Sequence, residues 1–158
     1  MLAFLLKNKT SNEVLNIFNK LEMELGNDLF ERIFPVILTD NGTEFSNPKA
    51  LEFNDEGVGR TRIFFCDLQA SYQKGMIEKN HEFIRYVLPK GTSFNNLVQD
   101  DIDLMLSHIN SLTRESLNWQ TPYKLAEAYL GKKILKKLNI SKVTASNVQL
   151  TPKLLKKK

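Results

Sequence analysis

Two apolar segments that each end in an aspartate constrain the fold of this chain more than any other feature. The segment VILTD covers residues 36–40 and is followed by Asn-Gly, and the segment RIFFCD covers residues 62–67. Short runs rich in β-branched and aromatic residues are typical of strands. A carboxylate at a strand end could bind a metal at the rim of a sheet. Alternatively, Asp40 could cap the turn that Asn-Gly predicts.

The flanking segments predict helices and one further strand. Helices are expected at residues 9–26, 76–88, 97–112 and 121–131, since each has apolar residues at helical spacing or clear end signals. In the first of them Thr10 or Ser11 is suited to the N-cap, and Gly26 to the end. The opening MLAFLL reads as the end of a buried strand. Helices that alternate with strands favour an α/β layer fold.

The composition limits the chemistry of any metal site. The chain has 158 residues with 42% hydrophobic residues, and Cys66, His81 and His108 are its only cysteine and histidines. A disulfide framework and a cysteine-based zinc site are therefore excluded. Oxygen ligands would be required, which favours magnesium, manganese or calcium. Cys66 reads as a buried small residue, and this cysteine usage suits a reducing cytoplasm.

The basic residues are concentrated in the last part of the chain. Residues 131–158 carry nine lysines and no acid, while the formal net charge of the whole chain is only +4. A lysine-rich end is usually solvated or disordered, and in some proteins it contacts nucleic acid or an acidic partner. The apolar opening is too short to span a membrane, so no membrane is expected among the partners.

Asp40 and Glu78 are the acids whose positions suggest a shared site. Glu78 lies on the helix that follows the second strand, and Gly75 lets this helix start close to the sheet. Two such carboxylates could hold divalent cations for phosphoryl transfer. Spacing alone is weak evidence, because Glu78 could also be an exposed acid that pairs with Lys74 or Lys79.

Three motifs carry a resemblance to a known family. The segments TDNGTEF (39–45), FCDLQASYQKGMIEKNHEFIRYVLPKGTSF (65–94) and RESLNWQTPYKL (114–125) resemble the catalytic core of DDE transposases and retroviral-type integrases. The resemblance is greatest to the bacterial insertion sequence thirty family and covers residues 1–130. It implies that Asp40 is the second catalytic aspartate and Glu78 the catalytic glutamate, and that both bind Mg²⁺ or Mn²⁺.

The resemblance also implies a fold and a division of the chain. The fold is a ribonuclease H-like integrase core, a mixed sheet flanked by helices, that lacks its first strands and ends in helices. The expected parts are a partial catalytic core (1–95), a helical extension (96–131) and a lysine-rich tail (132–158). The first catalytic aspartate is not matched, because the one earlier aspartate, Asp28, is expected in a turn. The chain is therefore expected to be inactive alone.

The family acts on DNA, which suggests partners and contacts. The expected partners are DNA at transposon ends and targets, and a second transposase subunit or the missing N-terminal part, in a bacterial, nucleoid-associated setting. Residues near the two acids could contact DNA through phosphates, base stacking or hydrogen bonds: Tyr72, Gln73, Lys74, Lys79, Asn80 and Arg85. The lysines and Arg85 could instead be solvated or paired surface charges.

Other acids and aromatic residues are expected to be structural. Asp67 could mimic a third metal ligand, but a turn cap before the helix is favoured, and Glu44 is expected to be a surface or structural acid. Five aromatic residues read as core: Phe18, Phe64, Phe65, Phe83 and Trp119.

Two alternative interpretations stay open. The chain could be a non-catalytic DNA-binding or subunit-assembly fragment, or an unrelated α/β domain whose acids are structural. Missing strands would leave unpaired sheet edges and exposed apolar surface, so poor solubility or dimerisation through that edge is expected.

Overall fold

The computed structural model describes the backbone of residues 1–67 and 75–155, and the side chains of these residues except 75–78. The chain divides into two compact units. The strand unit is Leu6–Lys74, and the helical unit combines Met1–Leu5 with Gly75–Lys158. Each unit is described by itself. The boundary between them falls within residues 1–95, so the expected three-part division stays a prediction.

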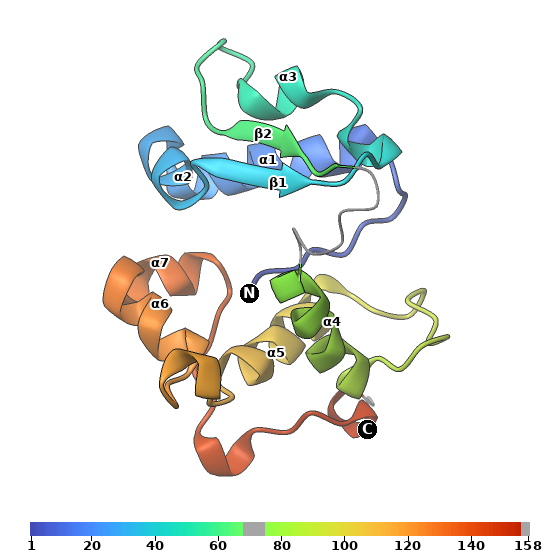
Figure 1. The fold of residues 1–158 in the computed structure, drawn as a ribbon, viewed down its shortest axis with the longest axis vertical. Coiled ribbons are helices and arrows are strands. Elements are labelled where there is room, and N and C mark those ends of the chain that lie inside the picture. The colour runs from blue at the N-terminus through green and yellow to red at the C-terminus, as the bar shows by residue number, and fades with distance from the viewer. Residues whose placement is uncertain (68–74, 156–158) are drawn as a thin grey trace. The chain divides into compact units, whose positions relative to one another are not determined.

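The strand unit contains helices on a small sheet (Figure 1). Its elements, in chain order, are α1 (Ser11–Leu25), α2 (Asn27–Ile33), β1 (Val36–Thr39), the 3-10 helix η1 (Thr43–Phe45), α3 (Pro48–Glu52) and β2 (Arg62–Phe65). The α/β class is thereby confirmed. Within the described part of the chain the sheet has two parallel strands, β1 and β2.

Helix α1 begins and ends as its sequence predicts. The Thr10 hydroxyl accepts a hydrogen bond from the Glu13 N–H, and Gly26 ends the helix with a φ of 86°. A positive φ is strained for residues with a side chain, so glycine suits this position. Helix α2 follows directly and was not predicted. Asp28 lies in the first turn of α2, and the expectation of a turn there is wrong, because an acid also suits a helix start.

The core of the strand unit lies where α1 and α2 pack together and α3 meets β2. Its apolar members are Val14, Phe18, Leu21, Leu25, Phe30, Leu51 and Ile63. Arg60 is also fully buried there. Its guanidinium donates hydrogen bonds to the carbonyls of Leu51 and Ala50 and to the side chains of Asn19 and Glu22. A buried charge is tolerated when its nitrogens are hydrogen-bonded and a counter-charge is present, as they are here.

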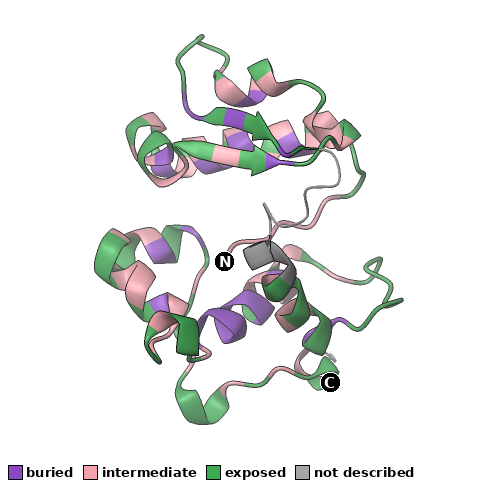
Figure 2. Ribbon diagram, in the orientation of Figure 1, coloured by how far each residue is buried: buried purple, intermediate pink, exposed green. Residues whose placement is uncertain are grey.

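The helical unit is built around α5, which is the most buried helix in Figure 2. The elements of this unit are α4 (Gly75–Val87), α5 (Gln99–Asn110), η3 (Glu115–Leu117), α6 (Pro122–Leu130), α7 (Lys132–Lys137), η4 (Ala145–Asn147) and η5 (Pro152–Leu155). Helix α6 lies within the predicted range of residues 121–131: the Thr121 hydroxyl accepts from the Lys124 N–H, Pro122 starts the helix, and Gly131 closes it.

The opening segment forms no strand, which corrects the expectation for MLAFLL. Residues 1–6 have no regular secondary structure. Met1, Ala3 and Leu5 pack against the core formed by α4 and α5. The Met1 amino group donates to Asn110 Oδ1 at 2.7 Å, and Leu5 N–H donates to Gln99 Oε1 at 2.9 Å. Side chains of α5 therefore satisfy polar groups that a strand would have used in pairing.

The lysine-rich end also differs from its expectation, because residues 132–155 pack on the helical unit. Leu135 and Leu138 are buried, and Leu150, Leu154 and Leu155 contact the core of this unit. Three backbone N–H groups of this segment donate to side chains of α5 and its C-cap: Ser141 to Ser107, Val143 to Ser111 and Gln149 to His108. The apolar residues between the lysines explain this packing.

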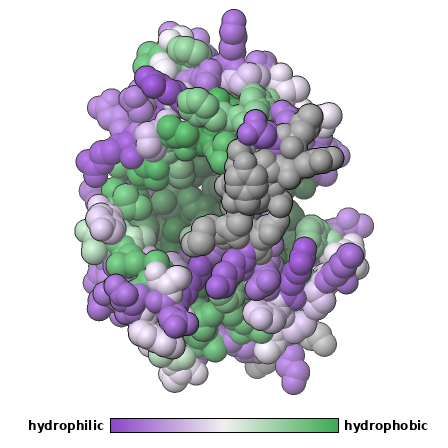
Figure 3. Space-filling view, in the orientation of Figure 1, coloured by the Kyte–Doolittle hydropathy of each residue, from purple (hydrophilic) through white to green (hydrophobic). Residues whose placement is uncertain are grey.

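Three of the five aromatic residues expected in the core are exposed. Trp119 is 71% exposed, Phe64 53% and Phe65 41%, whereas Phe18 is buried and Phe83 is half-buried. Trp119 lies in a turn with a φ of 60° that directs the chain into α6. Figure 3 shows apolar side chains at the surface over the strands. No helix among the described residues is long and apolar enough to cross a membrane.

Candidate functional site

Asp40 lies immediately after β1, at the carboxyl end of the sheet. The Cys66 N–H donates to the Thr39 carbonyl at 2.8 Å, which extends the strand pairing up to this aspartate. Asp40 is exposed, and its Oδ1 accepts a hydrogen bond from the Gly42 N–H at 3.3 Å. The turn cap that the sequence suggested is therefore present. A carboxylate has two oxygens with several lone pairs, so this cap does not by itself exclude a metal ligand.

A second carboxylate, Asp67, leaves the sheet at the same end. Thr39 of β1 is opposite Phe65 of β2 in the parallel register, so the residues after both strands emerge at one edge. The Asn41 side-chain amide donates to the Cys66 carbonyl at 3.5 Å and connects the two strand ends. This edge presents carboxylate and amide oxygens, which are the donors that Mg²⁺ and Mn²⁺ prefer.

Glu44 is a structural acid, as one reading of the sequence expected. Its carboxylate lies 3.3 Å from Lys9 Nζ, and its side chain is only 15% exposed. The carboxyl oxygens also approach the backbone of Gly42 closely: a Cβ at that position would lie 2.5 Å from Glu44 Oε2. A side chain at position 42 would therefore require the Glu44 carboxylate to move, and Glu44 lies in the loop that follows Asp40.

The partner that the sequence assigned to Asp40 lies on the other unit. Glu78 belongs to α4 by its backbone, and its side chain is not among the described ones. The predicted convergence of Asp40 and Glu78 therefore stays a prediction. Tyr72, Gln73 and Lys74 lie outside the described residues. Among the residues that are described, no three His, Cys, Asp or Glu side chains gather to hold a metal.

The remaining predicted DNA contacts lie on α4. Lys79, His81 and Arg85 are exposed. The Asn80 Oδ1 accepts a hydrogen bond from Arg114 Nη1 at 2.8 Å. The expected contacts of Lys79, Asn80 and Arg85 with DNA stay predictions.

Arg114 itself was not selected from the sequence. It is half-buried, and its guanidinium lies 4.7 Å from the centroid of the Phe83 ring. Burial lowers the pKa of the Arg114 guanidinium. The available signal was its place at the start of RESLNWQTPYKL, one of the three motifs that carry the family resemblance.

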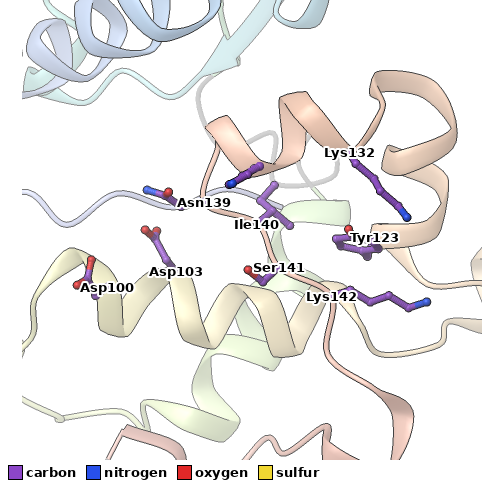
Figure 4. Close-up of a pocket in the computed structure, with 9 residues that line it drawn as sticks. Asp100, Asp103, Tyr123, Lys132, Asn139, Ile140, Ser141 and Lys142 are labelled. Carbon is purple, nitrogen blue, oxygen red and sulfur yellow. The ribbon is translucent and has the colours of Figure 1, made fainter.

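A lysine-lined cavity of about 780 Å³ lies beside α5 and α7. Figure 4 shows Asp100 and Asp103 projecting from α5 on one side, with Lys132 and Lys142 on the other. Lys136 also lines this cavity. The negative charges of Asp100 and Asp103 partly offset the positive charges of the lysines. This part of the lysine-rich end is therefore not a uniformly basic surface for nucleic acid.

Comparison with known proteins identifies relatives of the chain. A protein of Spiroplasma virus SpV1-R8A2 B that is described as an integrase is 36% identical over 117 residues, 74% of this chain and 34% of the relative. The transposase for insertion sequence element IS1086 of Cupriavidus metallidurans is 33% identical over 70 residues, 44% of this chain and 21% of the relative. The IS30A transposase of Escherichia coli K12 is 33% identical over 89 residues, 56% of this chain and 22% of the relative.

No family model matches the chain, and no solved structure matches it. The chain spans about a third of the length of the viral relative and about a fifth of the two transposases. Their names agree with the family indicated by the motifs around Asp40, Glu78 and Trp119. The resemblance to the insertion sequence thirty family is therefore confirmed, and this chain is a partial relative of its transposases.

Proposed function

We propose that this chain is part of a DNA transposase core with a ribonuclease H-like fold, in which Asp40 and Glu78 are metal-binding carboxylates. The observation that carries the proposal is the position of Asp40 in a chain related to transposases. This aspartate is exposed at the carboxyl end of a parallel strand pair. Ligand sites in α/β proteins are found at this end of the strands.

The residues around the two acids have distinct roles in this proposal. Asp40 holds one side of the site, with its orientation fixed by the Gly42 N–H. Glu78 completes the pair from α4. Exposed Lys79 and Arg85 attract the phosphates of transposon-end and target DNA, as does Lys74, while Asn80, Tyr72 and Gln73 contact the strand near the acids. None of these groups forms a covalent bond to DNA, so positioning and charge neutralisation carry the catalysis.

Mg²⁺ or Mn²⁺ fits the oxygen donors at this edge of the sheet. When bound, such an ion neutralises charge on the phosphodiester and favours in-line attack by water or by a 3′-hydroxyl. The resemblance assigns three carboxylates, and only Asp40 and Glu78 match in this chain. We therefore expect the third from another part of the complete transposase or from a second subunit, and no DNA cleavage by this chain alone.

Metal binding by the two acids tests the proposal directly. Titration with Mn²⁺ should broaden the amide NMR signals of Asn41 and Gly42, and calorimetry with Mg²⁺ should give a saturable signal. Asp40→Asn and Glu78→Gln should each abolish saturable binding, because each variant removes one charged ligand.

Two matched variants show whether the loss is specific. Asp55→Asn removes an exposed acid from the strand unit, and Glu82→Gln removes an exposed acid one turn after Glu78 on α4. Both should bind metal like the parent chain. Equal binding by the parent, Asp40→Asn and Glu78→Gln chains would contradict the proposed site.

Subunit assembly is a second candidate function, and the sheet favours it. Val36, Leu38, Phe64 and Phe65 are between 41% and 56% exposed on the two strands. Parallel strands are normally covered on both faces, so these side chains suit a protein partner. Light scattering should show self-association of the parent chain, reduced by Phe64→Glu and unaffected by Met23→Glu on α1. A monomeric parent at all concentrations would contradict assembly through a second copy.

A further inference from the structure

Arg114 is held in a fixed orientation by two residues of α4. Its Nη1 donates to Asn80 Oδ1 at 2.8 Å, and its guanidinium carbon lies 4.7 Å from the centroid of the Phe83 ring. A cation over an aromatic ring is attracted to it, and the ring restricts the plane of the guanidinium. The side chain is therefore positioned before any ligand arrives.

The other edge of the guanidinium lacks acceptors among the described residues. Arg114 Nε and Nη2 are buried and find no hydrogen-bond partner there. The desolvated guanidinium has a lowered pKa, and it helps to lower the pKa of the nearby Met1 amino group, which burial lowers first. Burial of a charged group without a partner is costly. An anion that binds this edge would remove the cost.

Arg60 in the strand unit shows what a purely structural arginine looks like in the same chain. It also lies over aromatic rings, those of Phe18 and Phe30. Its Nε, Nη1 and Nη2 all donate to protein acceptors, and Glu22 provides the counter-charge at 2.7 Å. Arg114 has one acceptor and no such carboxylate among the described residues. The difference indicates that its remaining partner is a ligand.

A pocket beside Arg114 has room for a phosphate group and carries suitable hydrogen-bond donors. Its volume is about 410 Å³, and its lining includes Arg114, Lys79 and the residues Thr113 and Ser116. The Nε–Nη2 edge of a guanidinium binds two oxygens of one phosphate, a lysine adds a point charge, and hydroxyls donate further hydrogen bonds. Among the described residues that line the pocket, Glu115 is the one acid.

We infer that Arg114, Lys79 and the hydroxyls of Thr113 and Ser116 form a phosphate-binding site whose ligand is a backbone phosphodiester of DNA. The identity of the ligand rests on the proposed function, whereas the site rests on Arg114 and its pocket. Arg114 and Lys79 would both contact the backbone, so the site adds affinity and fixes position without reading base sequence.

Inorganic phosphate tests the site without DNA. Titration of the parent chain, with chloride adjusted to constant ionic strength, should shift the Nε–H NMR signal of Arg114 saturably. It should also raise Tm by about 2–4 °C near saturation, since a ligand stabilises the state that binds it. Arg114→Gln should lose most of this rise, and Lys90→Gln, which removes an exposed lysine of the same unit, should keep it.

The NMR titration tests the phosphate site even if Arg114→Gln fails to fold, because the titration uses the parent chain. A signal of Arg114 that does not move with phosphate, or that moves linearly without saturation, would overturn the site. A Tm rise of the same size in a folded Arg114→Gln chain would also overturn it.

Binding of a fluorescent DNA duplex, measured by anisotropy, tests the ligand. Arg114→Gln should weaken binding about tenfold at low salt, equally for duplexes of different sequence, and reduce the salt dependence by about one phosphate contact. Lys90→Gln should show a smaller loss. Saturable phosphate binding with no DNA binding by the parent would overturn DNA as the ligand and the proposed function, while the site itself would stand. DNA binding that Arg114→Gln leaves unchanged would overturn only the inferred contact.

Discussion

The two units each contain an arginine stacked on aromatic rings, and the two differ in how their donors are satisfied. Arg60 of the strand unit is fully buried, and three of its nitrogens donate to protein acceptors, including the Glu22 carboxylate. The guanidinium of Arg114 in the helical unit donates to Asn80 alone among the described residues. A satisfied network holds a core together, whereas an unsatisfied cation beside a pocket is prepared for a ligand.

This difference shows that burial alone does not distinguish a charged side chain with a structural role from one with a functional role. Both guanidinium groups are removed from solvent to some extent and both lie over phenyl rings. The separation comes from a complete account of donors and acceptors. Glu44 pairs with Lys9 at 3.3 Å and lies in the loop after β1, whereas Asp40 is exposed at the carboxyl end of β1.

The largest expected effect comes from removing Arg60. Arg60→Leu should lower the free energy of unfolding by about 3–5 kcal/mol, because it leaves the Glu22 carboxylate without its cation and the carbonyls of Leu51 and Ala50 without this donor. Arg114→Leu should cost about 1 kcal/mol or less, since it loses one hydrogen bond and removes an uncompensated charge. Urea denaturation followed by circular dichroism measures both. Equal losses would break the comparison between the two arginines.

Local signals in the sequence predicted most helices and both strands. Thr10 and Gly26 bound α1, and Thr121 and Gly131 bound α6, as expected. Pro35 precedes β1, which starts at Val36. These features depend on caps and backbone restrictions that act within a few residues, so they can be inferred without knowledge of the tertiary fold.

The predictions that failed depended on distant contacts. MLAFLL has strand composition, but its polar groups bond to Asn110 and Gln99 of α5, about a hundred residues away. Phe64 and Phe65 are typical core residues, yet the two-stranded sheet leaves both exposed. The lysine-rich end packs through Leu135 because its apolar residues find α5. Composition cannot show which surface a segment will meet.

The candidate site was predictable only where it depends on local sequence, and not where it depends on distant contacts. The place of Asp40 at a strand end follows from local sequence, and the parallel pairing then adds Asp67 at the same edge. The role of Arg114 depends on which acceptors surround it, and those lie on α4, more than thirty residues away. A single arginine in a sequence does not show whether its donors are used.

A smaller effect is expected at the loop that follows Asp40. Gly42→Ala would place a Cβ 2.5 Å from Glu44 Oε2. The carboxylate must then shift, which weakens its pairing with the exposed Lys9, so the free energy of unfolding should fall by about 0.5 kcal/mol. Gly59→Ala is the matched control, because its nearest neighbour would be a ring atom of Phe53 at 3.9 Å. Urea denaturation of the two variants checks this, and equal stability would contradict a steric role for Gly42.

The smallest effect concerns His108, a buried group of the helical unit that is satisfied only when it is neutral. Its Nδ1 accepts a hydrogen bond from the Gln149 N–H at 3.0 Å, and burial lowers the pKa of the imidazole below its ordinary value of 6.5. Protonation would turn this acceptor into a donor and break the bond that anchors the end of the chain.

The sign of the pH effect follows from the lowered pKa. Unfolded His108 takes up a proton near pH 6.5, before the folded chain does, so the unfolded state binds more protons as the pH falls. The contribution of His108 to stability is thus complete above about pH 7 and is lost progressively as the pH falls through 6.5 toward the lower pKa of the folded state. Tm measured from pH 7.5 to 5 should decline more steeply for the parent chain than for His108→Gln. His81→Gln, which removes an exposed histidine of α4, should keep the parent slope. If His108→Gln also kept the parent slope of Tm against pH, another group would have to account for the acid sensitivity. The hydrogen bond from Gln149 to neutral His108 would then not contribute to stability in the way expected of a satisfied buried group.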